Sequence, residues 1–184
     1  MTDTRAVGAE VADLAGFLRG TWRLHRELLD ASGRTPPGSF TGDGTFTPDT
    51  EVPGLLRYLE QGTAQFGSHR GPATRCLAYH VDGGRARVDF DDGRFFHDLD
   101  LRAGVWEVEH LCRADLYRGR FEVDDEHRWR QQWTVTGPHK DQRIHTVLTR
   151  LVTEPTVADD EGNGGVTVAA QEPRPSGMRP TSRR

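Results

Sequence analysis

Residues 74–101 read TRCLAYHVDGGRARVDFDDGRFFHDLDL, and this stretch decides the fold. Apolar and polar residues alternate in three short runs, as they do in half-buried β-strands. The runs are residues 74–81, 86–90 and 95–101. The segments Asp82–Gly84 and Asp91–Gly93 separate them, and both are of hairpin length and contain glycine. The stretch therefore predicts three consecutive antiparallel strands.

The same pattern continues on both sides of this stretch. Further strands are predicted at residues 22–29, 39–46, 55–66, 105–112, 117–123, 128–135 and 144–152. No helical pattern of crossover length lies between these runs, so an α/β sheet is disfavoured. About ten short antiparallel strands joined by turns indicate an all-β, up-and-down barrel, and ten strands leave room for a ligand-sized interior.

The two ends of the chain differ from this middle part. Val11, Leu14 and Leu18 recur at helical spacing and predict a short N-terminal helix that ends near Gly20. The last segment is rich in Gly, Pro and Arg and poor in large apolar residues, which predicts a disordered C-terminal tail. We therefore expect an N-terminal segment at 1–20, a barrel at 21–153 and a disordered tail at 154–184.

Composition excludes several classes of protein. The 184 residues include 24 Lys and Arg against 28 Asp and Glu, and this net charge of −4 disfavours nucleic-acid binding. No run approaches the ~18 apolar residues of a membrane helix, and the first residues lack the apolar segment of a signal peptide. Cys76 and Cys112 are too few for a disulfide framework, so we expect a cytoplasmic protein.

Several motifs connect the chain with a known type of barrel. Gly20-Thr21-Trp22 is similar to the Gly-x-Trp opening of lipocalin-like (calycin) barrels. In those barrels an arginine of the last strand packs over the tryptophan, and Arg150 has the matching place here. The resemblance thus implies a cation–π contact between Trp22 and Arg150 that closes the barrel.

A wider set of motifs resembles one particular family. The set comprises Phe17-Leu-x-Gly-x-Trp, Gly38-x-Phe40-x-Gly42, Tyr58-x-Glu60-x-Gly62, Arg75, Arg94-Phe95-Phe96-His97-Asp98-Leu99, His110-x-Cys112-x-x-Asp115-Leu116-Tyr117 and Gly137-Pro138-x-Lys140-Asp141. Together they resemble a bacterial and fungal lipocalin-like family labelled domain of unknown function 6314. The resemblance implies a calycin-like fold and no particular activity, so function has to be argued from the site.

Alternation along the 95–101 strand leaves two choices for the barrel lining. Phe96, Asp98 and Asp100 share one face, whereas His97 shares the other face with two leucines. An apolar lining places His97 inside, and a polar lining places Asp98 and Asp100 inside beside Phe96. The sequence leaves both arrangements open.

Other strands offer polar groups in pairs. Tyr58 and Glu60 share a face, and an inward Glu60 would pair with Arg75 of the next strand, for ligand recognition or for strand register. His110 and Cys112 also share a face. A buried thiol beside a hydrogen-bonded histidine is favoured there over a tuned thiolate or a metal pair, because no HExxH or CxxC motif accompanies them.

The two remaining candidates lie near turns. Tyr117 shares a face with Asp115, and it either orients a ligand or packs as a half-buried strand residue with Asp115 serving the turn. Lys140, the single lysine of the chain, lies in a predicted hairpin connection. We interpret it as a turn residue, because an exposed turn does not lower the pKa of a lysine as a catalytic role requires.

These features support three functional hypotheses. The first is a barrel that binds a small hydrophobic or amphipathic molecule, aromatic or anionic in part, with no cofactor, metal, nucleic acid or membrane as partner. Its ligand-binding residues are predicted to be Tyr58, Glu60, Arg75, Phe96, Asp98, His110, Cys112 and Tyr117.

The second hypothesis is a cofactor-free isomerase, cyclase or decarboxylase. It uses His97 or His110 as base, Tyr117 as acid and Arg75 to hold an anionic group. The third and least favoured is a haem protein resembling nitrobindin-type barrels, with His97, His110 or His145 as axial ligand.

Overall fold

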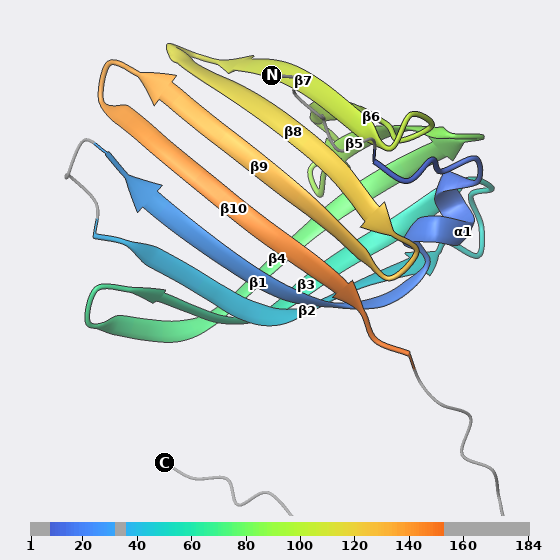
Figure 1. The fold of residues 1–184 in the computed structure, drawn as a ribbon, viewed down its shortest axis with the longest axis horizontal. Helices are drawn as coiled ribbons and strands as arrows, with labels where there is room; N and C mark the ends of the chain where they lie inside the picture. Colours follow the sequence, from blue (N-terminus) through green and yellow to red (C-terminus); the bar gives the residue numbers. More distant parts are fainter. Residues whose placement is uncertain (1–7, 32–35, 153–184) are drawn as a thin grey trace, which may run out of the picture. The chain divides into compact units, whose positions relative to one another are not determined.

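The computed structural model describes residues 8–31 and 36–152, which form one helix and ten strands (Figure 1). They are α1 (Leu14–Leu18), β1 (Gly20–Asp30), β2 (Gly38–Pro48), β3 (Leu55–Phe66), β4 (His69–Asp82), β5 (Arg85–Phe90), β6 (Phe95–Asp100), β7 (Val105–Cys112), β8 (Asp115–Asp125), β9 (Arg128–Gly137) and β10 (Lys140–Arg150). The predicted all-β class, the ten strands and the short helix are confirmed. The predicted tail at 154–184 lies outside the described residues, and the domain boundaries stay predictions.

All ten strands belong to one antiparallel sheet that curls into a nearly closed barrel. The strand order is β6-β5-β4-β3-β2-β1-β10-β9-β8-β7, so β1 and β10 pair and the two edges are β6 and β7. These edge strands follow one another in the chain but form no ladder, which leaves a seam between them. The indole Nε1 of Trp106 on β7 donates a hydrogen bond across this seam to the backbone oxygen of Asp98 on β6, at 2.9 Å.

The helix α1 covers one end of the barrel (Figure 1). Buried apolar side chains pack against it there. Leu14 and Leu18 of the helix are fully buried. The indole Nε1 of Trp22 donates to the backbone oxygen of Leu18 at 2.8 Å, which ties the helix to β1. The guanidinium of Arg150 lies 4.2 Å from the centre of the Trp22 ring and donates to the backbone oxygen of Arg19. The implied cation–π closure is confirmed.

An irregularity between β5 and β6 changes which side chains face inward. Val88 pairs with His97 and Asp89 pairs with Phe95, so Phe96 is an extra residue in β6. Such a β-bulge places two consecutive side chains on similar sides of a strand. Phe96 and His97 are both buried, whereas Asp98 is exposed. The sequence offered His97 or Phe96 as the inward residue, and the bulge turns both inward.

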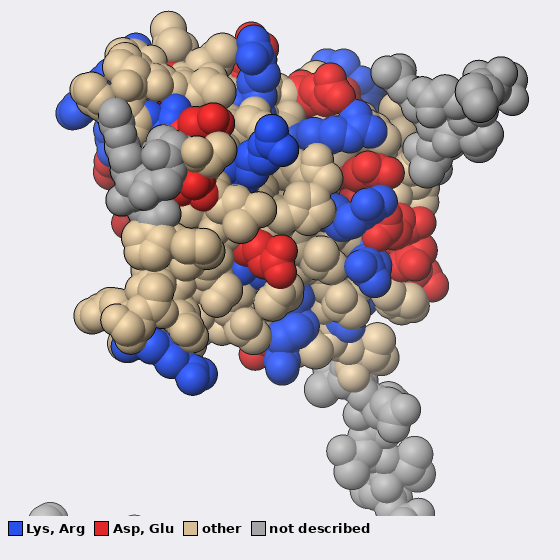
Figure 2. All heavy atoms as spheres, turned by 60° about the vertical axis from the view of Figure 1, so that its left-hand side comes forward, with Lys and Arg blue, Asp and Glu red and all other residues tan. Residues whose placement is uncertain are grey.

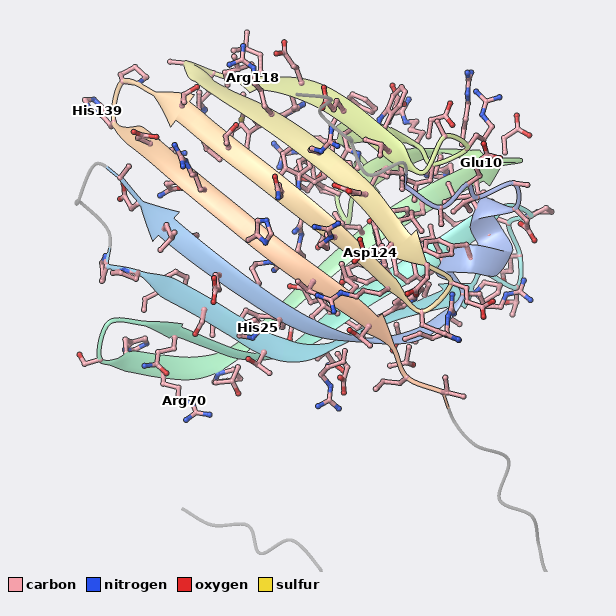
Figure 3. The ribbon with its side chains drawn as sticks, in the orientation of Figure 1. Glu10, His25, Arg70, Arg118, Asp124 and His139 are labelled. Atoms are coloured by element: carbon pink, nitrogen blue, oxygen red, sulfur yellow. The ribbon has the colours of Figure 1, made fainter. Side chains whose placement is uncertain are left out.

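The outer surface of the barrel carries many charges of both signs. Basic and acidic side chains interleave on the face that Figure 2 draws. Several form ion pairs, such as Arg118 with Glu109 on neighbouring strands, at 2.6 Å. His25, Arg118 and Asp124 extend from the outside of the sheet (Figure 3). None of the helices within residues 8–31 and 36–152 has the length and apolar character needed to cross a membrane.

Candidate functional site

The half of the barrel interior away from α1 contains a cavity of about 660 Å³. Eight strands contribute to its wall: β1, β4 and β5 to β10. Its volume falls in the range of sites for small organic ligands. Two smaller hollows of about 400 and 450 Å³ lie on the outside of the sheet, among ion-paired side chains. The interior cavity is therefore the candidate site.

Aromatic rings form one wall of this cavity. Phe96 stacks on Trp133 of β9, with ring centroids 5.2 Å apart and an angle of 16° between the ring planes. The ring centroids of Phe90 and Phe96 are 4.6 Å apart, and His110 of β7 contacts Phe96 edge to face, with ring centroids 5.9 Å apart. The bulge brings Phe96 into this position, where the rings offer a flat apolar surface that suits an aromatic or conjugated ligand.

A buried ion pair lies beside the aromatic wall. Arg26 of β1 donates to both carboxylate oxygens of Glu60 on β3, at 2.6 and 2.9 Å, and its Nε donates to the hydroxyl of Thr146. The Tyr58 hydroxyl donates to the same carboxylate at 3.0 Å. Glu60 is thus paired with Arg26, and the prediction that it pairs with Arg75 is wrong. Arg75 stands opposite Glu60 in the β3–β4 ladder, but its guanidinium lies over Phe96 instead.

The Glu60 carboxylate makes stability depend on pH. Burial alone would raise the pKa of Glu60, but the hydrogen bonds and charge of Arg26, with the charge of Arg75, hold it below its ordinary value. A carboxylate with a lowered folded-state pKa contributes stability that is complete above its unfolded pKa of about 4.3 and lost as pH falls through the folded value.

We expect the stability gap between the wild type and Glu60→Gln to narrow as pH falls below about 4, because protonated Glu60 resembles glutamine. Chemical unfolding followed by tryptophan fluorescence at several pH values between about 7 and 3 measures this gap. A gap that stays constant over that range would contradict the assignment.

Arg75 is a cation of the cavity wall that has no ion-pair partner in the part of the chain that the structure describes. Its guanidinium lies 5.4 Å from the centre of the Phe96 ring, and it forms no hydrogen bond or ion pair with another described residue. The other arginines of the wall are Arg26, Arg94 and Arg113. Arg26 is neutralised by Glu60 and Arg94 by Asp92, and no described acid lines the cavity. The cavity therefore has an excess of positive charge.

His97 packs against Phe96 and Trp133 of the aromatic wall but does not line the cavity. Its Nδ1 is 2.8 Å from the backbone oxygen of Asp98, and since a carbonyl only accepts, this nitrogen carries the hydrogen. Burial, with the charges of Arg75 and His110, lowers the pKa of His97 to about 4. The ring is therefore neutral at about pH 7 and packs against Phe121, at 5.1 Å.

The structure brings most of the predicted site residues together. Five of them line the cavity: Arg75, Phe96, His110, Cys112 and Tyr117. Tyr58 and Glu60 are buried beside the cavity. The Tyr58 hydroxyl donates to Glu60, and Glu60 accepts from Arg26, which lines the cavity. Asp98 is exposed on the outside of β6 and does not face the cavity. Both cysteines are free and exposed, so the prediction of a buried thiol at Cys112 is wrong. No group of three metal-ligating side chains occurs among the described residues.

Several lining residues were missed by the sequence reasoning. Arg26 shares the inward face of β1 with Trp22 and Leu24, so its alternation with them was a usable signal. Trp133, which alternates with the buried Trp129 on β9, was expected as a core or lining residue without a role at the site, and it lines the cavity. Both signals needed the inward face of the strand to be identified first, and the Gly-x-Trp motif identifies it for β1.

Comparisons with known proteins agree with this fold. A model of the family described as "Family of unknown function (DUF6314)" matches residues 18–150. No curated protein matches the chain.

Two solved structures are similar in fold. The S-type phycobiliprotein lyase CPES from Guillardia theta has a TM-score of 0.59 at 8% identity, over 79% of this chain and 95% of that one. A protein of unknown function from the DUF3598 family of Nostoc punctiforme has a TM-score of 0.53 at 16% identity, over 77% of this chain and 51% of that one. At these identities the likeness concerns the fold alone.

Proposed function

The chain belongs to the DUF6314 family, whose function is unknown, so we propose a function from its own cavity: it binds a small aromatic or amphipathic molecule that carries an anionic group. The observation that carries this proposal is the Arg75 guanidinium on the wall of a cavity of about 660 Å³, which forms an ion pair with no acid among residues 8–31 and 36–152. A partly desolvated cation is costly without a counter-charge, and a carboxylate or sulfonate of a ligand supplies one. Phe96 and Trp133 then hold the apolar part of the ligand.

A matched pair of fluorescent probes tests this proposal. 8-Anilinonaphthalene-1-sulfonate and N-phenyl-1-naphthylamine share one aromatic skeleton, and only the first carries an anion. We expect Arg75→Gln to weaken binding of the sulfonate about tenfold, the effect of losing one charge-assisted hydrogen bond, and to change binding of the neutral amine less than about twofold.

Arg70→Gln is the control variant for this measurement. Arg70 lies on the same strand, β4, but its side chain is exposed and extends away from the barrel (Figure 3). It should leave the affinities for both probes unchanged. If Arg75→Gln weakens both probes equally, or neither, the anion-binding role of Arg75 is excluded.

A cofactor-free enzyme is the second candidate, and one observation favours it. His110 and Tyr117 both line the cavity, and their ring centroids are 6.2 Å apart. A base and an acid next to an anion-binding arginine could move a proton on a bound substrate. Of the two candidate bases, only His110 is positioned for this, because His97 does not line the cavity.

Of the three histidines considered as axial haem ligands, His110 is the one that lines the cavity. His145 is exposed on the outside of β10 and contacts Gln132, so it faces away from the cavity. His97 is enclosed by rings, as described above.

A cytoplasmic location is also part of the proposal, and the two free cysteines support it.

A further inference from the structure

The cavity has a second polar feature near the β7–β8 and β9–β10 turns, the latter marked by His139 in Figure 3. The ammonium of Lys140 lies 2.6 Å from the carboxylate of Asp115 and 3.4 Å from the hydroxyl oxygen of Tyr117. Hydrogen bonds with these two side chains raise the pKa of Lys140, so its ammonium stays charged. Three side chains from β8 and β10 thus form one connected cluster.

The donor and acceptor roles within this cluster are fixed by chemistry. An ammonium group has only donors, so the Tyr117 oxygen accepts the hydrogen bond from Lys140. The hydroxyl hydrogen of Tyr117 is then left for a different acceptor. No other described residue accepts it, and Tyr117 lines the cavity. The free donor is therefore available to a molecule inside the cavity.

We infer that Tyr117, oriented by Lys140 and Asp115, donates a hydrogen bond to a neutral oxygen of the ligand whose anionic group Arg75 holds. This inference rests on the proposed function, because both groups belong to the same cavity. A donor polarised by a neighbouring ammonium suits a carbonyl or quinone oxygen. Lys140 and Asp115 act as positioning residues, and Tyr117 contacts the ligand.

A continuous run of rings connects the two polar points. Arg75 lies 5.4 Å from the Phe96 ring centre, Phe96 lies 5.9 Å from His110, and His110 lies 6.2 Å from Tyr117. A ligand that contacts both Arg75 and Tyr117 therefore lies along this aromatic surface. The ligand class that fits is a flat, conjugated acid with a carbonyl oxygen at some distance from its carboxylate.

Two probes that differ only in the carbonyl oxygens test the inference. Anthraquinone-2-carboxylate and anthracene-2-carboxylate share a ring system and a carboxylate, and titration calorimetry gives the affinity for each. We expect Tyr117→Phe to weaken binding of the quinone acid about fivefold, as for one lost hydrogen bond, and to change the affinity for the anthracene acid less than about twofold. Lys140→Met should likewise weaken binding of the quinone acid more than binding of the anthracene acid. A merely structural role of Lys140 would change both affinities alike.

The outcomes separate this inference from the proposed function. If Tyr117→Phe and Lys140→Met affect both acids equally or neither, while Arg75→Gln weakens both, the donor role of Tyr117 fails and the anion site stands. If neither acid binds to the wild-type protein, both proposals fail. Thermal melting of each variant provides the folding control, and Lys140→Met is the second variant should Tyr117→Phe fail to fold.

Discussion

Replacing Glu60 with glutamine is expected to lower the free energy of unfolding by about 3 kcal/mol, because breaking a buried ion pair from one side leaves an uncompensated charge. The side chains of Arg26 and Glu60 are 18% and 4% exposed, so water reaches the remaining guanidinium poorly. A guanidinium keeps its proton at about pH 7 without an acidic partner, so the charge of Arg26 remains in the variant and is unpaired. Denaturant unfolding at about pH 7 measures the loss.

Two further variants give this measurement its controls. The double variant Arg26→Met with Glu60→Leu removes both charges and should recover most of the loss, since apolar replacements of a buried pair are often neutral. Asp43→Asn breaks the exposed Arg23–Asp43 pair, which also joins β1 to a neighbouring strand, and should cost less than about 1 kcal/mol. Equal losses for Glu60→Gln and Asp43→Asn would show that the buried pair has no special role.

The strands were predictable because their determinants are local. A half-buried strand alternates polar and apolar residues, and the turns after β4 and β5 contain Gly83 and Gly93, both with positive φ. The predicted strands 55–66 and 105–112 agree with β3 and β7 to the residue. The start of β4 was missed because Gly71 and Pro72 interrupt the alternation there, although the ladder with β3 continues through them.

The bulge in β6 was not predictable from alternation. Period-two reasoning assigns each residue to one of two faces, so it forced a choice between His97 and Phe96. One extra residue shifts the register, and nothing in the sequence around Phe96 marks the shift. The aromatic wall of the cavity depends on this single irregularity. The strand could therefore be predicted from the sequence, whereas the cavity wall could be identified only from the structure.

Arg26 and Glu60 pair across the strand β2, which lies between their own strands. β2 separates β1 from β3, and its inward positions beside the ion pair include Gly42 and Gly44. A Cβ atom at Gly44 would lie 2.5 Å from the Tyr58 hydroxyl oxygen, so the absence of a side chain leaves room for the polar cluster. Sequence reasoning considered only the adjacent strand and therefore chose Arg75.

Replacing Trp22 with alanine is expected to lower the free energy of unfolding by about 4 kcal/mol, as for other large aromatic residues removed from a core. Trp22 is fully buried, and its ring lies 5.4 Å from Phe17 and 6.2 Å from Trp129. The substitution opens a void beneath α1 and removes the hydrogen bond to the Leu18 backbone. Since single domains are stable by only about 5–15 kcal/mol, denaturant unfolding should show a large decrease in the midpoint concentration.

Two other substitutions separate packing from hydrogen bonding in this result. Trp22→Phe keeps most of the ring volume but removes the indole donor, so a loss of about 1–2 kcal/mol is expected. Trp106→Ala removes the same residue type from a partly exposed position at the β6–β7 seam, where less apolar surface is buried, and should cost less than Trp22→Ala. If Trp106→Ala costs as much, the seam and not the helix-covered end contributes most to the stability of the barrel.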